Sequence, residues 1–158
     1  MAVDMFLKLT GIKGESLDHK HKDEIDVLSF SFGASQSGSH STGGGGGAGK
    51  VSFQDFSIIK NVDSASPDLF DRICSGQHIQ NGVFTARKAG KEQVDFYKVS
   101  FEDVLISSIS PGGTGTDVPR ESVSLNFASL KIEVRRQTAS GNFGPWETTS
   151  CDLAGNKD

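Results

Sequence analysis

The stretch VSLNFASLKIEV, residues 123–134, alternates apolar and polar side chains. Val123, Leu125 and Phe127 share one face, and the apolar positions resume after a one-residue slip in phase near Ser129. Alternation with a period of two is typical of a β-strand that buries one face. A slip of one residue indicates a β-bulge, a feature that bends long strands in barrels. The stretch therefore predicts a long, bent strand.

The same alternation recurs along most of the chain. It predicts further strands at Val3–Leu9, Leu28–Phe32, Phe53–Ile59 (with Val51 leading in), Val83–Arg87, Val94–Phe101 and Val104–Ile109. Glycine-containing turns fall between strands at residues 88–91, 111–115 and 141–145. Many strands joined by glycine turns are typical of a sandwich or a barrel. We expect a mainly β protein, a compact β-barrel of two antiparallel sheets.

One segment breaks the alternation and predicts a single short α-helix at about residues 67–75. Ser66 stands where a capping residue is needed, Pro67 occupies the first helical position, and Gly76 follows the end. The apolar side chains expected on its buried face are Leu69, Phe70, Ile73 and Cys74.

Length and charge limit the classes of protein that this chain can represent. Its 158 residues suit one domain over residues 1–158. A net charge of −4 offers no basic field for nucleic acid or an anionic membrane. Asp4 and Lys8 interrupt the apolar residues of the N-terminus, so no signal-peptide core is expected. The chain should fold in the cytoplasm, and any export must proceed without a cleaved leader.

The glycine run GGGGGAGK, residues 43–50, partly matches a phosphate-binding loop. Such a loop joins a strand to a helix and ends in Ser or Thr after the lysine. Here Val51 follows Lys50, the next residues alternate like a strand, and a Ser/Gly-rich stretch precedes the run. We expect instead a long extended loop at about residues 33–50. Structureless loops of that length in compact domains are usually functional or disordered. Docking on another chain would offset the cost of ordering it.

No catalytic or metal-binding pattern stands out. His19 and His21 have a ligand-like spacing but no patterned third ligand, and we expect both to be exposed. Cys74 and Cys151 lie far apart and are expected to be reduced thiols, although a disulfide between them stays open. The carboxylates show no spacing of an acid–base pair. We expect a protein that is not an enzyme and needs no cofactor.

Seven short motifs, taken in order, resemble the haemolysin-coregulated proteins, the tube subunits of type VI secretion systems. They are MAVDMFLKLTGIKGES, HKDEIDVLSFSFG, SQSGS, GGGGGAGKVSFQDFSIIK, RKAG, EDVLISSIS and ESVSLNFASLKIE. The similarity runs from residue 2 to about residue 137. Phe30 and Phe32 stand where the family often has tryptophans, and Cys151 stands where its closing segment often has a large aromatic residue.

The resemblance implies a barrel with one helix, a homohexameric ring with an open lumen, and rings stacked into a tube. It implies assembly in the bacterial cytoplasm inside a contractile sheath on a baseplate, under a spike protein, and then ejection from the cell. Some relatives carry small effector proteins in the ring. Partners would be other copies, the spike, the sheath, the baseplate and effectors, without nucleic acid or membrane insertion.

Stacked rings need a contact between two unlike surfaces. The glycine-rich arm is one candidate half, with residues Ser35, Gln36, Ser37, Gly43, Gly44, Gly45, Gly46 and Gly47. The turn at Glu102 and Asp103, or the loop at 111–120, is the other. Ser29 and Ser31, opposite the aromatic face, line either the lumen or the outer surface.

A solitary β-barrel that binds a small ligand or a carbohydrate is the alternative. One Trp and one Tyr in the whole chain supply few rings for stacking on sugars.

Overall fold

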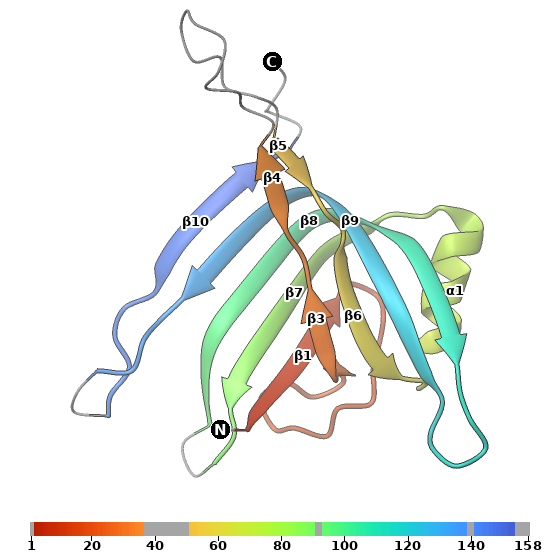
Figure 1. Cartoon of the computed structure of the whole chain (residues 1–158), viewed down its shortest axis with the longest axis horizontal. Helices are drawn as coiled ribbons and strands as arrows, with labels where there is room; N and C mark the ends of the chain where they lie inside the picture. The colour runs from red at the N-terminus through yellow and green to blue at the C-terminus, as the bar shows by residue number, and fades with distance from the viewer. Residues whose placement is uncertain (1, 37–50, 91–92, 139–140, 154–158) are drawn as a thin grey trace, which may run out of the picture.

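The computed structural model describes residues 2–36, 51–90, 93–138 and 141–153 (Figure 1). The elements in these ranges are β1 (Val3–Leu9), β2 (Ile25–Val27), β3 (Ser29–Ser31), β4 (Ala34–Gln36), β5 (Val51–Phe53), β6 (Phe56–Asn61), α1 (Ser66–Ser75), β7 (Ile79–Lys88), β8 (Val94–Gly112), β9 (Arg120–Val134) and β10 (Glu147–Asp152).

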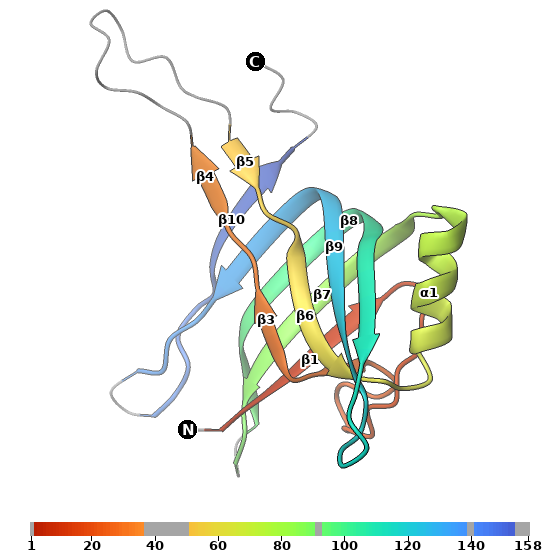
Figure 2. The same cartoon turned by 45° about the vertical axis from the view of Figure 1, so that its right-hand side comes forward.

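A large antiparallel sheet curls until its two ends meet. Its strand order is β2-β1-β7-β8-β9-β6-β3, and β10 also pairs with β9. Only Leu28 separates β2 from β3 in sequence, although the two strands end opposite sides of that order. The Leu28 amide donates to the Ile59 carbonyl at 2.8 Å. The chain thus passes from one end of the sheet to the other and nearly closes a barrel (Figure 2).

This architecture confirms the expected mainly β barrel with one helix. The second sheet is small, since it consists of β4 and β5. The strand predicted at Leu28–Phe32 is shorter than expected and consists of β3, because Leu28 is 43% exposed and marks the change of partner between β2 and β3. Conversely, β8 runs unbroken through the residues that were expected to separate two strands, and it extends into the predicted turn at 111–115.

Phenylalanines fill the centre of the barrel. The Phe56 ring lies 5.2 Å from that of Phe84 and 4.9 Å from that of Phe101, measured between centroids. Phe30 packs on Phe84 at 4.5 Å. Each fully buried phenylalanine contributes about 1.5–3 kcal/mol of hydrophobic stabilisation. The inward half of the alternation therefore builds the core, as expected.

The phase slip near Ser129 does not produce the expected bulge. Phe101 pairs with Leu130 and Val104 pairs with Phe127 in the same register. In each strand the alternation of buried and exposed side chains shifts by one residue at this point. Because the shifts in β8 and β9 lie opposite each other, the pairing of the two strands stays in register. The register shifts of β8 lie elsewhere, between Ile106 and Ser108 against β9 and beside Ala86 and Arg87 against β7.

The helix begins one residue earlier than predicted. Ala65 is its N-cap and provides no side-chain hydrogen bond, so Ser66 is helical and does not act as the predicted cap. The end is as expected: Gly76 has φ of +67° and its amide donates to the Arg72 carbonyl at 2.9 Å. Glycine adopts this left-handed conformation without steric cost.

The buried face of α1 is narrower than its sequence suggests. Leu69 is fully buried and Ile73 packs against the core. Phe70 is 50% exposed, and Cys74 is exposed. Both cysteines are free thiols, which confirms that prediction.

Candidate functional site

The candidate site is a set of surfaces, and the first is the β4–β5 hairpin, which projects beyond the barrel (Figure 2). Ser35 and Gln36 lie on β4, whose three residues are all exposed. The Phe53 ring packs against the barrel, 6.2 Å from the ring of Phe127. At the base of the hairpin its two sides are joined by a hydrogen bond from the Gln54 amide to the Gly33 carbonyl. The candidates Ser37, Gly43, Gly44, Gly45, Gly46 and Gly47 lie outside the described residues.

Glu102 and Asp103 are exposed residues of β8 and do not form a separate turn. Asp103 adopts φ of +52°. Its Oδ1 lies 2.6 Å from Nδ1 of His78, which joins the segment after α1 to β8. Ser129 donates to Glu102 at 3.2 Å. These contacts fix the two carboxylates at the bend of the sheet.

Ser29 and Ser31 are exposed on β3, on the face opposite Phe30. Ser31 pairs with Ser57 of β6, Ser57 pairs with Ser124 of β9, and Ser108 of β8 also pairs with Ser124. Four serines therefore form one row across four neighbouring strands. We call this surface the serine face.

The serine face continues in a second row. Ser29 pairs with Ile59, Ile59 with Ser122, and Ser110 with Ser122. Sequence analysis missed Ser57 and the serines of β8 and β9. Their signal was the polar half of each alternation, but only the strand order shows that these halves adjoin.

A charged clasp holds the loop that follows β1. The buried Arg87 guanidinium donates to both carboxylate oxygens of Asp18, at 2.7 and 2.5 Å, and more weakly to Asp4. This hydrogen bonding holds the pKa of Asp18 well below its usual range. The clasp is a structural feature that composition alone does not reveal.

His21 is buried, contrary to prediction. Its Nδ1 lies 2.8 Å from Glu24 and its Nε2 lies 3.1 Å from Asp95, and its ring stacks on Phe6 at 4.5 Å. His19 is exposed as expected. Within the described residues no group of three or more His, Cys, Asp or Glu side chains is arranged to hold a metal ion.

A second buried polar cluster joins β6, β9 and the start of α1. Lys60 is fully buried and donates to Glu121 and Ser66, and its Nζ lies 2.8 Å from an oxygen of Asp63. Ser66 also donates to Glu121 at 2.5 Å. Since every charged member has an opposite partner, the cluster is suited to orienting α1. In the described part of the chain, no helix has the length and apolar composition needed to cross a membrane.

Comparison with known proteins identifies the family of this chain. Residues 6–134, well over half of the chain, match the family model described as "Type VI secretion system effector, Hcp". Protein hcp1 of Pseudomonas aeruginosa is 51% identical over 143 residues, which cover 89% of this chain and 88% of that protein.

Solved structures support the same relationship. The crystal structure of Hcp1 from Salmonella typhimurium superposes with a TM-score of 0.81 at 34% identity, covering 99% of both chains. A structure described as a type six secretion system protein gives a TM-score of 0.92 at 29% identity, again covering 99% of both chains. The chain belongs to the Hcp family of type VI secretion proteins.

Proposed function

We propose that this protein is a ring-forming structural subunit of the type VI secretion tube. Family membership and the serine face carry the proposal. Copies associate into a homohexameric ring around an open lumen, and rings stack into a tube. The chain supplies contacts between copies and no catalysis, and it acts without a cofactor.

The serine face is the surface that we assign to the lumen. Its outward side chains on β3, β6, β8 and β9 include Ser29, Ser31, Ser57, Ser108 and Ser124, and all five are uncharged. Short hydroxyls are satisfied by water and lack the charge that would hold a passing protein tightly. The opposite face of the same strands is mainly apolar and fills the barrel, with the buried Lys60–Glu121 pair at one end. A polar wall of this kind suits cargo that must be retained and then released.

Stacking requires that the two ends of a copy be complementary. The β4–β5 hairpin stands at one end of the molecule and the β8–β9 hairpin, residues 113–119, at the other (Figure 1). Phe127 contacts both Phe53 of the hairpin and Phe101, the neighbour of Glu102 on β8, so this stretch of β8 lies near the hairpin base. We therefore pair the β4–β5 hairpin of one ring with the 113–119 end of the next, and place Glu102 and Asp103 with the hairpin.

The hairpin itself supports a docking role. Two short strands alone are marginally stable in water, and β4 is exposed along its whole length. A neighbouring copy would cover these strands. In this proposal the protein assembles in the bacterial cytoplasm with the spike, sheath and baseplate, and then leaves the cell with any effector in its lumen.

Native mass spectrometry and negative-stain imaging of the purified chain test the proposal together. We expect six copies per particle and rings with a central hole, some of them stacked. Solitary particles at high protein concentration would contradict the ring. Binding of a mono- or oligosaccharide by such monomers would favour the carbohydrate-binding alternative.

A further inference from the structure

Exposed apolar side chains gather along one trough. Seven large apolar side chains are exposed among the described residues, and five of them line two adjoining hollows of about 590 and 240 Å³. These five are Val3, Leu17, Leu28, Val62 and Val118. The hollows share Asp26 and Leu28, so we treat them as one surface, the trough. A gathering of this kind marks an interaction site more often than scattered exposure does.

Leu17 is held outward by a fixed loop. The side chain is 94% exposed. On one side the Ser16 amide donates to the Glu24 carbonyl at 3.0 Å, and on the other Asp18 is clasped by Arg87. The loop therefore presents a preorganised leucine, which reduces the entropy lost when a partner covers it.

The trough is acidic. Asp4, Asp18 and Asp26 line the larger hollow, and Glu15 and Asp63 join Asp26 in the smaller. Arg87 is the cation among these lining residues, and Asp18 and Asp4 already engage it. Burial, and then repulsion from the other four carboxylates, raises the pKa of Asp26. A partner that brings a cation would relieve this repulsion.

The same chain carries a matching cationic surface at the outer end of β9 and β10, which we call the wing tip. Arg135 lies 4.5 Å from the Trp146 ring and 5.4 Å from the Phe143 ring. Lys98 adds a contact to Trp146 at 5.0 Å and Lys88 one to Phe143 at 5.3 Å. Cations and rings thus alternate in a ladder. Beside the ladder, Arg136 is exposed and Val134 is 40% exposed.

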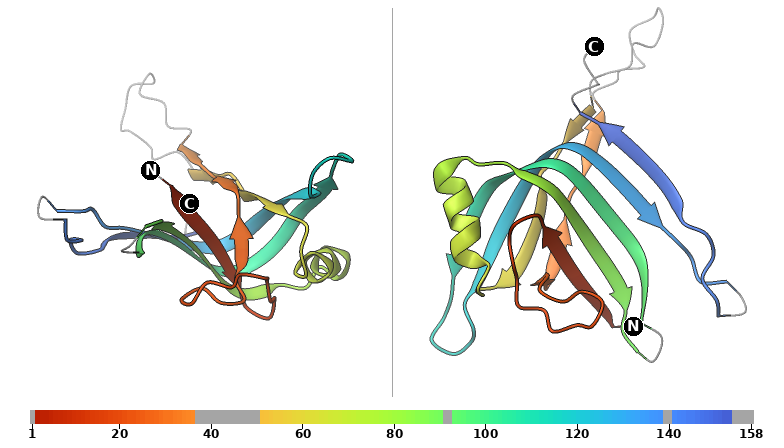
Figure 3. Two further views of the ribbon diagram at one scale, coloured as in Figure 1. Left: turned by 90° about the horizontal axis from the view of Figure 1, so that it is seen from below. Right: turned by 180° about the vertical axis from the view of Figure 1, so that it is seen from behind.

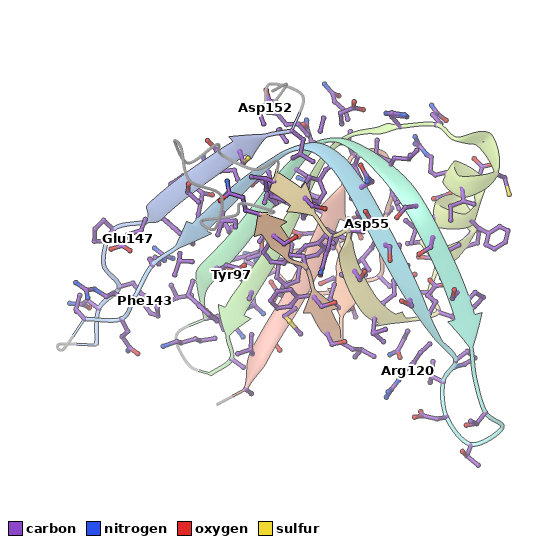
Figure 4. All side chains as sticks on the ribbon, turned by 45° about the horizontal axis from the view of Figure 1, so that its top comes forward. Asp55, Tyr97, Arg120, Phe143, Glu147 and Asp152 are labelled. Atoms are coloured by element: carbon purple, nitrogen blue, oxygen red, sulfur yellow. The ribbon has the colours of Figure 1, made fainter. Side chains whose placement is uncertain are left out.

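We propose that the trough of one copy receives the wing tip of a neighbouring copy in the same ring. This inference rests on the proposed function, because it requires copies to associate. The outer end of β9 and β10 lies on one side of the barrel and the β8–β9 hairpin, residues 113–119, on the other, at the same end of the molecule (Figure 3). Val118 of that hairpin lines the smaller hollow of the trough. Figure 4 shows the same separation, with Phe143 on one side and Arg120 at the foot of the β8–β9 hairpin on the other. When the two contacting surfaces lie at the same height on opposite sides of each copy, successive copies are related by rotation without translation along the ring axis, and the ring can close.

Charge reversal with restoration is the test. Asp26→Lys and Arg136→Glu should each weaken association between copies by about tenfold or more at low salt, measured by sedimentation velocity over a range of concentrations. The double variant should regain most of the affinity, since each contact again joins opposite charges. Asp71→Lys, the same charge change on exposed α1, is the matched control and should associate like the wild type.

Leu17→Ser tests the apolar half independently, because this side chain contributes almost nothing to the folded core. It should weaken association several-fold, whereas Phe70→Ser, outside the trough, should not. Circular dichroism establishes that each variant folds. Single variants that associate like the wild type, or a double variant as weak as the singles, would overturn the inference and leave the ring standing. A wild-type chain that stays monomeric would instead remove the ring itself.

Discussion

The Ser57 and Ser124 hydroxyl oxygens lie 2.9 Å apart on neighbouring strands β6 and β9, on the face that points away from the core. Ser57 also pairs with Ser31. A hydrogen bond between half-exposed hydroxyls contributes only about 0.5–1.5 kcal/mol. The barrel therefore depends little on these hydroxyls for its stability, and the surface that they form can serve contacts outside the barrel.

Replacing Ser31 with glutamate should change cargo retention without unfolding the barrel. The side chain is exposed, and so the free energy of unfolding should move by less than about 0.5 kcal/mol. Rings should still form by native mass spectrometry, but the effectors that co-purify from the producing cell should change, because six added charges would line the lumen. Gln77→Glu, exposed after α1 and outside the trough, is the control. Identical effector recovery from Ser31→Glu would argue that β3 faces outer solvent.

The buried Lys60–Glu121 pair should be costly to break from either side. Lys60→Met or Glu121→Leu would leave one buried charge with fewer partners, and we expect a loss of about 3–5 kcal/mol in urea unfolding. The double variant Lys60→Met/Glu121→Leu should be closer to the wild type, since only Asp63 then lacks its cation and this carboxylate keeps the Ala65 amide as a donor. Two single losses that simply add in the double variant would show that the residues do not act as a pair.

The Asp18–Arg87 clasp should make the free energy of unfolding depend on pH, with the stabilisation lost as the pH falls. Since the pKa of Asp18 is lowered on folding, the stabilisation is fully present above the ordinary carboxylate value and disappears as the pH falls through the lower folded value. Asp18→Asn should therefore be less stable than the wild type near about pH 7, and the gap should narrow only below about pH 4. Urea unfolding from neutral to strongly acidic pH measures this gap.

Glu24 provides the contrast to Asp18. Burial is the largest influence on its pKa, which it raises, so the folded state binds this proton at a higher pH than the unfolded chain does. The difference in the free energy of unfolding between Glu24→Gln and the wild type should therefore change with pH above the ordinary pKa of a carboxyl group. Over the same pH range the difference between Asp18→Asn and the wild type should stay constant. If both variants narrowed the gap over the same pH range, the assigned direction for one of them would be wrong.

Local sequence pattern located most of the strand-forming segments and the helix, because each depends on near neighbours, but it misplaced the ends of several strands and missed the break between β5 and β6. Val3–Leu9 was predicted to the residue, and the helix to within one residue. The barrel closure at Leu28 was not foreseen, because a change of pairing partner leaves no mark in a run of three-residue strands. The burial of His21 depends on Asp95, 74 positions later, and no local pattern reports such a contact.

The candidate surfaces, too, were predictable from the sequence only in part. The outward orientation of Ser31 follows from alternation alone, and the structure bears it out. The row that joins it to Ser57 and Ser124 requires the strand order β9-β6-β3, which arises from pairing between distant segments. The wing tip was invisible at the sequence level, since its cations are scattered along the chain and only folding brings them to two aromatic rings.

The ladder at the wing tip should control local order in the β9–β10 region. Arg135 contacts both Trp146 and Phe143, and its Nε donates to the Asp95 carbonyl at 2.7 Å. Arg135→Gln removes both ring contacts, each worth about 0.5–2 kcal/mol. Because Trp146 is the only tryptophan in the chain, its fluorescence reports on this region alone. In a urea titration we expect the variant's fluorescence transition to precede the circular dichroism transition, whereas the two coincide in the wild type. Coincident transitions in both proteins would show that the wing unfolds only with the barrel, and that the ladder does not set its order.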